Sequence, residues 1–431
     1  MKNKNVCMFV WNHFTNDARV LRECTALAEN GYNVDLICIH DPKVENMPYV
    51  EEKCENFHVY RVRRYLGLLT LLQRVYSYCL KFKAIGALSF LAWAFLTYLL
   101  PHVLIPVTIL AFLILKTRIK GLVVKGSIII RMILRGYRKN YGFYHSNDLN
   151  TLPQGYICAK WRFKKKTLIY DSHEVQTSRT GYNSPVYGLM EKTLVKKINS
   201  MIVENHTRAK YNEELYGFYP NVVHNYPFKQ TKETFEKVNI HKILGLPKDE
   251  KILLYQGGIQ TGRGLDKLIQ ATPHFKEGTL VLIGDGKIKP QLLQMVDEMK
   301  LHDKVKFIPK VPLSDLPKYT RNAYLGFQVL NNVCFNHYSA SSNKLFEYMM
   351  AGVPVVACDF PEIKRVVEGD ATGICIDSHK PMEIAQAVNQ LLEESELYLN
   401  LSMNSIEASS KYNWEEEQFA FLDIYRNLIV E

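Results

Sequence analysis

Several short motifs that would assign this chain to a common class are missing from its sequence. It contains no Asp-x-Asp pair, and its His and Cys residues never cluster at metal-ligand spacing, so a metal ion held by the protein is not expected. It also lacks a Walker phosphate loop, a nucleophile elbow and any stretch in which aromatic and basic residues alternate. These absences argue against a P-loop nucleotidase, an α/β-hydrolase and a nucleic-acid-binding protein.

The cysteines are scattered, and none forms a Cys-x-x-Cys pair. The chain has nine of them, several inside apolar runs, which predicts reduced core residues in the cytosol rather than disulfides. The first residues, Met1 to Trp11, combine a basic start with a short apolar run and no small-residue cleavage site. We therefore expect a first β-strand there and not a signal peptide.

Length and pattern predict two α/β domains. The 431 residues are 47% hydrophobic, and short apolar runs alternate with helical periodicity, as in parallel sheets flanked by helices. One series of strands runs from Val6–Val10 to Val222–His224, and a second from Ile252–Tyr255 to Gly373–Ile376. The predicted domains are 1–223 and 224–411, with a hinge near 224–246 and a last helix, within 412–431, that packs back on the first domain.

The basic charge of the chain is concentrated in one region. The net charge is +11, and residues 116–139 contain eight Lys or Arg and no acidic residue, interleaved with apolar triplets. A basic face beside an apolar face is attracted to an anionic bilayer. An anionic membrane surface is therefore the predicted partner.

An uncharged segment precedes this basic region. Residues 84–115 carry no charged side chain and would extend about 48 Å as a helix, beyond the ~30 Å of one bilayer core. Pro101 and Pro106 are expected to divide it. Because the segments before and after the insert are expected to build one sheet, both must lie on the same side of a membrane. The sequence predicts a re-entrant or interfacial helical hairpin in an insert at about 65–140; a buried helical pair is the alternative.

The sequence of residues 341–362 predicts a helix whose first turn forms an anion-binding site. Ser341 or Ser342 is expected to cap a helix that ends at Gly352, and its first N–H groups, with Lys344, could hold a diphosphate. Glu347 lies one turn after Asn343, where it could bind ribose hydroxyls. Any capped amphipathic helix would share the serine and the apolar stripe, so these residues alone leave a structural role open.

Two glycine-containing turns follow strands in the same half of the chain. The first has Gly257 and Gly258 directly after a strand, with Arg263 before the next helix, which suits close approach of a phosphate. Its spacing is not that of a dinucleotide-binding fingerprint. The second turn contains Gly284 and is either a plain turn or the border of a base pocket.

Polar clusters also follow two strands of the first half. His173 lies in Asp-Ser-His-Glu at 171–174, and His145 and Asp148 follow the preceding strand. Ligands of open α/β sheets bind beyond the carboxyl ends of the strands, so His173 could bind a sugar or transfer a proton. A satisfied structural histidine is the alternative for each. Asp17 either caps the first helix or serves the acceptor, and Arg19 and Glu23 are expected to form an exposed pair.

Taken together, these motifs resemble the GT-B glycosyltransferases of the GT4 type. The resemblance rests on Asn-Asp-x-Arg-Val-Leu at 16–21, Asp-Ser-His-Glu at 171–174, Tyr255 to Gly264, and the segment 343–357. It implies two Rossmann-like domains facing a cleft and a retaining reaction without a protein-bound metal. The membrane-associating insert in the N-terminal domain lies outside the resemblance and is expected from its own residues. The implied catalytic residues are His173 and Asp17. The implied donor-binding residues are Gly257, Gly258, Arg263, Gly284, Ser342, Asn343, Lys344 and Glu347.

The chain departs from the family pattern at three places. The partner of Glu347, eight residues earlier, is Ser339 and not an acid, and the usual basic residue after the strand glycine is Gly258. The N-terminal glycine-rich loop is replaced by Trp11 to Thr15, which includes His13. Contacts of the sugar or the acceptor with His13, His145, Asp148 and Ser339 are therefore predicted only as possibilities.

The predicted function is transfer of a sugar from a UDP- or GDP-linked donor to a membrane-bound, polyprenyl-diphosphate-linked glycan in cell-surface polysaccharide synthesis. The predicted location is the cytoplasmic face of the cell membrane, with no cofactor and no nucleic-acid partner. Two alternatives stay open: a sugar-nucleotide 2-epimerase on the same fold, and an inactive membrane-attached scaffold.

Overall fold

The structure is a computed structural model that describes residues 3–15, 17–117, 119–176, 184–230 and 238–430. Its chain divides into two compact units, each described here by itself. The first unit comprises Met1–Asp171 and Thr193–Ser200, and the second comprises Ser172–Lys192 and Met201–Glu431.

The first unit is built on a largely parallel sheet with the strand order β3-β4-β2-β1-β5-β6. Only β3 pairs antiparallel, with β4. The apolar strands β1 and β2 lie near the middle and are buried almost throughout, as expected for a sheet covered on both faces. The strands are β1 (Asn5–Phe9), β2 (Asn33–Ile39), β3 (Val50–Cys54), β4 (Phe57–Val62), β5 (Phe143–Asn147) and β6 (Thr167–Ser172), and the helices beside them are α1 (Ala18–Glu29) and α6 (Leu152–Lys160).

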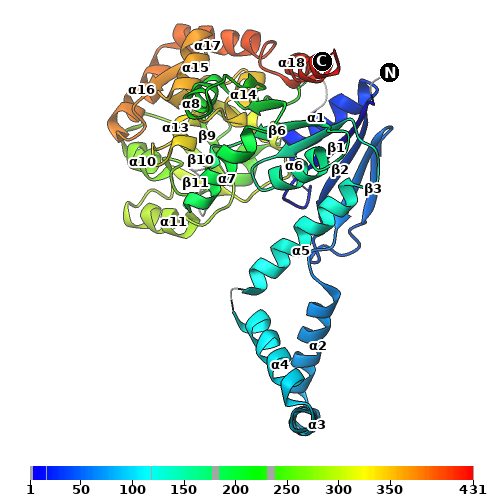
Figure 1. Ribbon diagram of the computed structural model, residues 1–431. Helices are drawn as coiled ribbons and strands as arrows, with labels where there is room; N and C mark the ends of the chain where they lie inside the picture. The colour runs from blue at the N-terminus through cyan, green and yellow to red at the C-terminus, as the bar shows by residue number, and fades with distance from the viewer. Residues whose placement is uncertain (1–2, 16, 118, 177–183, 231–237, 431) are drawn as a thin grey trace. The chain divides into compact units, whose positions relative to one another are not determined.

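Four further helices of this unit form the predicted insert: α2 (Gly67–Lys81), α3 (Lys83–Leu99), α4 (Pro101–Lys116) and α5 (Ile119–Gly136). The helix α5 packs on β2, β4 and α6 through its second half, where Ile128 and Met132 are buried. By contrast, α2 packs on α3, α3 on α4 and α4 on α5, and Figure 1 shows α2, α3 and α4 apart from the strands of their unit. We call α2, α3 and α4 the apolar arm.

The apolar arm corrects two expectations about the insert. Pro101 does begin a helix, but Pro106 lies inside α4, so the segment breaks once and not twice. The alternative of a buried helical pair is wrong, because α3 buries none of its residues; Leu88 and Tyr98, for instance, are 67% and 84% exposed. No helix among the described residues is both long enough and apolar enough to span a bilayer.

The second unit contains a six-stranded parallel sheet with the order β11-β10-β9-β12-β13-β14. The strands β7 and β8, which precede it in the chain, pair in parallel with each other and are the last two strands of the eight-stranded sheet β3-β4-β2-β1-β5-β6-β7-β8. The strands are β7 (Ser200–Val203), β8 (Asn221–Val222), β9 (Ile252–Gln256), β10 (Thr279–Ile283), β11 (Val305–Ile308), β12 (Ala323–Gln328), β13 (Val355–Cys358) and β14 (Gly373–Ile376).

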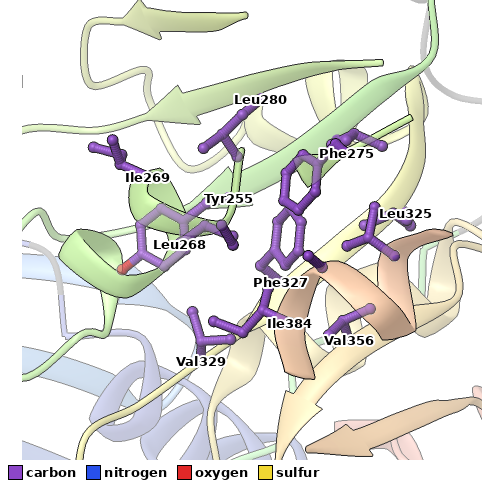
Figure 2. Close-up of a cluster of buried hydrophobic side chains, with 14 of the residues drawn as sticks. Tyr255, Leu268, Ile269, Phe275, Leu280, Leu325, Phe327, Val329, Val356 and Ile384 are labelled. Atoms are coloured by element: carbon purple, nitrogen blue, oxygen red, sulfur yellow. The ribbon is translucent and has the colours of Figure 1, made fainter. Parts of the chain in front are cut away.

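Helices cover both faces of this second sheet. On one face, Tyr255, Phe327 and Val356 pack against α10 and α16, as Figure 2 shows. On the other, Leu254 and Val355 pack against α14. The helices from β6 onward are α7 (Pro185–Val195), α8 (His206–Tyr216), α9 (Ile240–Leu244), α10 (Leu265–Ala271), the 3-10 turn η2 (Thr272–His274), α11 (Lys289–Glu298), α12 (Leu316–Thr320), α13 (Phe335–Tyr338), α14 (Asn343–Met350), α15 (Pro361–Gly369), α16 (Pro381–Glu393), α17 (Ser395–Ala408) and α18 (Trp414–Val430).

The predicted strands are found at or within two residues of their expected positions. The sequence did not predict β3, because its Val-Glu-Glu-Lys-Cys has no apolar alternation; it is an exposed edge strand, and charged residues are common at such edges. The predicted strand Val222–His224 is shorter than expected and ends at Val222. The last helix is confirmed as α18, whereas its packing on the first domain stays a prediction.

Candidate functional site

Two glycine turns of the second unit pack directly against each other. Gly257 follows β9 with φ +134°, and Gly284 follows β10 with φ +150°, conformations that L side chains rarely adopt. A Cβ on Gly284 would lie 2.0 Å from the carbonyl oxygen of Gly257. The Gly257 N–H donates to the Ile283 carbonyl over 2.9 Å. Glycine is therefore required for this backbone contact at the carboxyl end of the sheet.

Lys344, in the first turn of α14, reaches back to these turns. It is 8% exposed, and its Nζ lies 4.1 Å from the centre of the Tyr255 ring. The same Nζ would be 3.5 Å from a Cβ on Gly257. The expected serine cap is wrong in part: Ser342 occupies the N-cap position, but its side chain makes no hydrogen bond to the helix N–H groups.

Positive charge accumulates around Lys344. The pKa of the Lys344 ammonium is lowered to about 7, first by burial and then by the Arg263 guanidinium, while Glu347 acts in the opposite direction. The pKa of His337 is also lowered, first by burial and then by Arg263. His337 itself lies against the turn, because a Cβ on Gly262 would come within 2.5 Å of its ring. A buried ammonium beside a guanidinium favours an anionic ligand.

Glu347 lies one helical turn from Lys344 and is held by the last residue of β9. The Gln256 side-chain amide donates to Glu347 Oε2 over 2.6 Å. The oxygen of the same side-chain amide, Gln256 Oε1, accepts from the Thr320 hydroxyl over 2.7 Å. The sheet end thus brings together a cation pair, a carboxylate and two glycine turns, as the sequence predicted for Gly257, Arg263, Gly284, Lys344 and Glu347.

Residues 236–408, which contain this arrangement, match the family model described as glycosyl transferases group 1. The match spans less than half of the chain, and it shows that this region is similar to the group 1 glycosyl transferases. Among curated proteins, it is 26% identical to a D-inositol 3-phosphate glycosyltransferase of Xylanimonas cellulosilytica over 54% of the chain and 58% of that protein. A protein of the same name from a Nocardioides strain is 26% identical over 56% of each chain. The matched region therefore spans just over half the length of these curated relatives.

Solved structures show the fold of the chain. Sucrose-phosphate synthase from Thermosynechococcus elongatus superposes with a TM-score of 0.73 at 17% identity, covering 99% of both chains. Anabaena HepE in complex with UDP-glucose gives a TM-score of 0.67 at 13% identity, covering 98% of this chain and 99% of that one. The expected α/β architecture of two Rossmann-like units is therefore confirmed.

The first unit holds a buried charge cluster. Arg19 is 6% exposed and pairs with Glu23 at 2.9 Å and with Asp171 at 2.9 Å, so the expectation of an exposed Arg19–Glu23 pair is wrong. The sequence suggested exposure because nothing local shows that Asp171 comes from β6 to meet α1. His145 is fully buried, with Nε2 3.9 Å from Glu23 and 3.8 Å from Asp171. It belongs to this ionic cluster.

The other predicted residues of the first unit follow β1 and β5. Asp17 caps the helix, because its side chain accepts from the Val20 N–H over 3.1 Å and from Asn12 over 2.6 Å. His13 Nδ1 lies 2.9 Å from the Ile39 carbonyl oxygen. Asp148 has a φ of +62°, and its N–H donates to the Asp171 carbonyl. Asn16 of the family motif and Arg118 of the basic region lie outside the described residues.

The segment that carries His173 belongs to the second unit. The His173 carbonyl accepts from Arg208, which is 3% exposed and also pairs with Glu204. Two hydrogen bonds between Asn336 and the backbone of Val175, of 2.8 and 3.1 Å, tie the same segment to α13. The backbone next to His173 is therefore fixed by side chains of α8 and α13.

Ser339, which stands where the family pattern has an acid, is fully buried within this arrangement. Its hydroxyl donates to the Phe335 carbonyl over 2.8 Å and accepts from Arg208 Nε over 3.1 Å. A guanidinium thus contacts the hydroxyl at position 339. Sequence reasoning assigned no role to Arg208, Asn336, Gln256, Thr320 or His337, and only Gln256, next to Gly257, had a signal that could have indicated one.

Proposed function

We propose that this protein transfers a sugar from a nucleoside-diphosphate donor to a lipid-linked acceptor at a membrane surface. The observation that carries the donor half is the pair of cations, Arg263 and Lys344, gathered at the Gly257 turn and the first turn of α14. Because a diphosphate carries two or more negative charges, it would offset the positive charge of these two side chains. A UDP-linked donor is favoured, since HepE was solved with UDP-glucose.

The proposed reaction breaks the bond between the anomeric carbon and the diphosphate oxygen. The acceptor hydroxyl forms the new bond to that carbon and loses its proton. Arg263, Lys344 and the N–H groups that open α14 would stabilise the charge that develops on the leaving diphosphate. These groups supply the positive charge, so the proposal needs no protein-bound metal, and activity should persist in a chelator.

Within the same proposal, His173 contacts the transferred sugar and Glu347 binds the ribose. Gly284 borders the base, and Asn343 and Ser342 lie at the helix opening toward the diphosphate. We propose retention of the anomeric configuration; NMR analysis of the first-formed product tests this directly. Asp17 keeps two roles in the proposal, as the helix cap already described and as a group on the acceptor side.

The acceptor half of the proposal rests on the apolar arm. Its large apolar side chains are widely exposed, including Leu88, Phe90 and Phe95 at 63–67%. The chain from residue 56 to 147 contains 14 Lys or Arg and no Asp or Glu. Exposed apolar helices in a segment whose Lys and Arg are not balanced by any acidic residue suit the boundary of an anionic bilayer. The α3 helix has 17 residues, about 25 Å, which is shorter than a bilayer core and suits shallow or re-entrant insertion.

Donor binding is tested by calorimetry with UDP- and GDP-sugars, followed by transfer assays on membrane extract. We expect Lys344→Met and Glu347→Gln to lose at least about tenfold in donor affinity or transfer, the effect of one charged contact. Full activity in either variant would overturn the donor site. Donor binding with release of a 2-epimer would favour the epimerase, and binding without any turnover would favour the scaffold.

The membrane is tested by flotation with vesicles of phosphatidylglycerol or of phosphatidylcholine alone. We expect the protein to float with the anionic vesicles, and the triple variant Arg74→Gln, Lys81→Gln, Lys83→Gln to float less. The matched control replaces three exposed lysines of the second unit: Lys300, Lys304 and Lys364.

A second candidate acceptor is a small phosphorylated polyol, which the names of the curated relatives favour. Transfer to inositol phosphate, together with no binding to vesicles, would show that the acceptor is a phosphorylated polyol and not a lipid-linked glycan.

A further inference from the structure

Gln256 is a polar residue at the end of an otherwise apolar strand. It follows Ile252-Leu253-Leu254-Tyr255 and is 1% exposed. An amide buried in such a position is costly unless its groups are hydrogen-bonded. Both polar atoms of the Gln256 amide are hydrogen-bonded, the nitrogen to Glu347 and the oxygen to Thr320.

The chemistry of the partners fixes the orientation of the Gln256 amide. An ionised carboxylate only accepts hydrogen bonds, so the amide nitrogen must face Glu347 Oε2, 2.6 Å away. The amide oxygen then faces Thr320, whose hydroxyl lies 2.7 Å from it and 3.0 Å from the Leu316 carbonyl. The Thr320 side chain is 1% exposed. The carboxylate thus fixes the orientation of the amide, and a buried hydroxyl on α12 contacts the amide oxygen that this orientation presents to it.

The backbone of Gln256 is joined to the same helix. Its N–H donates to the Tyr348 hydroxyl over 3.2 Å, and that hydroxyl donates to the Leu254 carbonyl over 2.9 Å. Glu347 and its neighbour Tyr348 thus both contact one strand residue. Gln256 also directly precedes Gly257, the glycine beside the Lys344 ammonium. The backbone of Gln256 therefore joins α14 to the strand that leads into the glycine turn, and its side chain contacts the Glu347 carboxylate of that helix.

We propose that Thr320 and Gln256 are positioning residues that aim the Glu347 carboxylate at the vicinal hydroxyls of the ribose of a nucleoside diphosphate. This inference rests on the proposed donor site. A relay of this kind acts on the ribose contact and leaves the diphosphate contacts of Arg263 and Lys344 unaltered. That separation distinguishes positioning from general support of the fold, because disrupted packing would weaken both contacts.

The experiment measures the affinities of UDP, 2′-deoxy-UDP and inorganic diphosphate by calorimetry, for wild type, Gln256→Met and Thr320→Val. We expect Gln256→Met to weaken UDP binding about tenfold or more and Thr320→Val about threefold or more, as for hydrogen bonds to a charged group. Inorganic diphosphate should bind all three proteins within twofold. The loss caused by Gln256→Met should be smaller for 2′-deoxy-UDP than for UDP.

Thr279→Val is the matched control, since the Thr279 hydroxyl is also bonded to a carboxylate, Glu250 Oε1, at 2.6 Å and the residue is 3% exposed. It should leave UDP affinity unchanged. Unchanged UDP affinity in both Gln256→Met and Thr320→Val, or an equal loss for inorganic diphosphate, would overturn the relay while the donor site stands. Failure of wild type to bind any nucleoside diphosphate would remove the donor site and the relay together.

Discussion

Arg19 and Asp171 are 152 residues apart in the sequence and form a bidentate contact in the interior of the first unit. Arg19 Nη2 lies 3.0 Å from Oδ1 and 2.9 Å from Oδ2 of Asp171, and Nε lies 3.2 Å from Oδ2. Glu23 adds a second carboxylate to the same guanidinium. One cation thus joins the first helix to the sixth strand.

We expect Arg19→Met to lower the free energy of unfolding by about 3–5 kcal/mol, because it leaves two buried carboxylates without their cation. Urea denaturation measures this loss. The control is Arg426→Met, whose partner Asp423 and own side chain are both more than half exposed. That exposed pair should contribute less than about 1 kcal/mol. Equal losses in the two variants would show that the buried cluster is not structural.

Donor affinity should depend on pH through Lys344. The folded protein without ligand has a Lys344 pKa of about 7, so the ammonium is lost as the pH rises above that value. UDP binding then requires uptake of a proton, and affinity should fall by up to about tenfold per pH unit. Calorimetry in buffers of different ionisation enthalpy measures the uptake. Lys344→Met should bind more weakly with no such proton uptake.

The lowered pKa of Lys344 should also make the stability of the ligand-free protein depend on pH. Between pH 7 and 10.5 the unfolded chain holds a proton on Lys344 that the folded chain does not, so stability contributed by this group rises with pH in that window. Below pH 7 both states are protonated, and the slope disappears. Comparing the pH dependence of unfolding in wild type and Lys344→Met isolates this effect. An identical dependence in the two proteins would contradict the lowered pKa.

Gly284 should not tolerate alanine. The new Cβ would meet the Gly257 carbonyl oxygen at 2.0 Å, so the two turns would have to separate, at a cost of about 2–4 kcal/mol. We expect loss of UDP binding with this destabilisation. Gly217 provides the control, since its φ is +80° but no atom lies within 4 Å of the Cβ position. Gly217→Ala should cost only about 1 kcal/mol and keep the UDP affinity.

Trp93 should report insertion of the apolar arm. It lies on α3, and its Nε1 donates to the Thr108 hydroxyl of α4 over 3.0 Å, which joins the two helices. With anionic vesicles that contain brominated acyl chains, we expect quenching of Trp93 fluorescence. The signal is isolated by subtraction of Trp93→Phe, which removes only this indole. Equal quenching in the two proteins would contradict burial of the arm in the acyl region.

Much of the fold followed from local pattern, and the failures are informative. The strand Ile252–Tyr255 is predicted by four consecutive apolar residues before a glycine turn, and the structure extends it by one residue to Gln256. The edge strand β3 was missed because its residues are exposed and charged. Within the site, Arg263, Lys344 and Glu347 were predicted from the helix opening and the glycine turn, which are features of contiguous sequence.

The sequence by itself determined the two α/β series, the glycine turns, the helix that carries Lys344 and Glu347, and the long uncharged insert. Each depends on residues that are neighbours in the chain, where periodicity and turn chemistry record the local conformation. Only the tertiary structure decided that Arg19 is buried against Asp171, that Gln256 holds Glu347, and that the insert leaves its apolar side chains exposed. These facts depend on which distant strand or helix meets a side chain, and local periodicity carries no record of that partner.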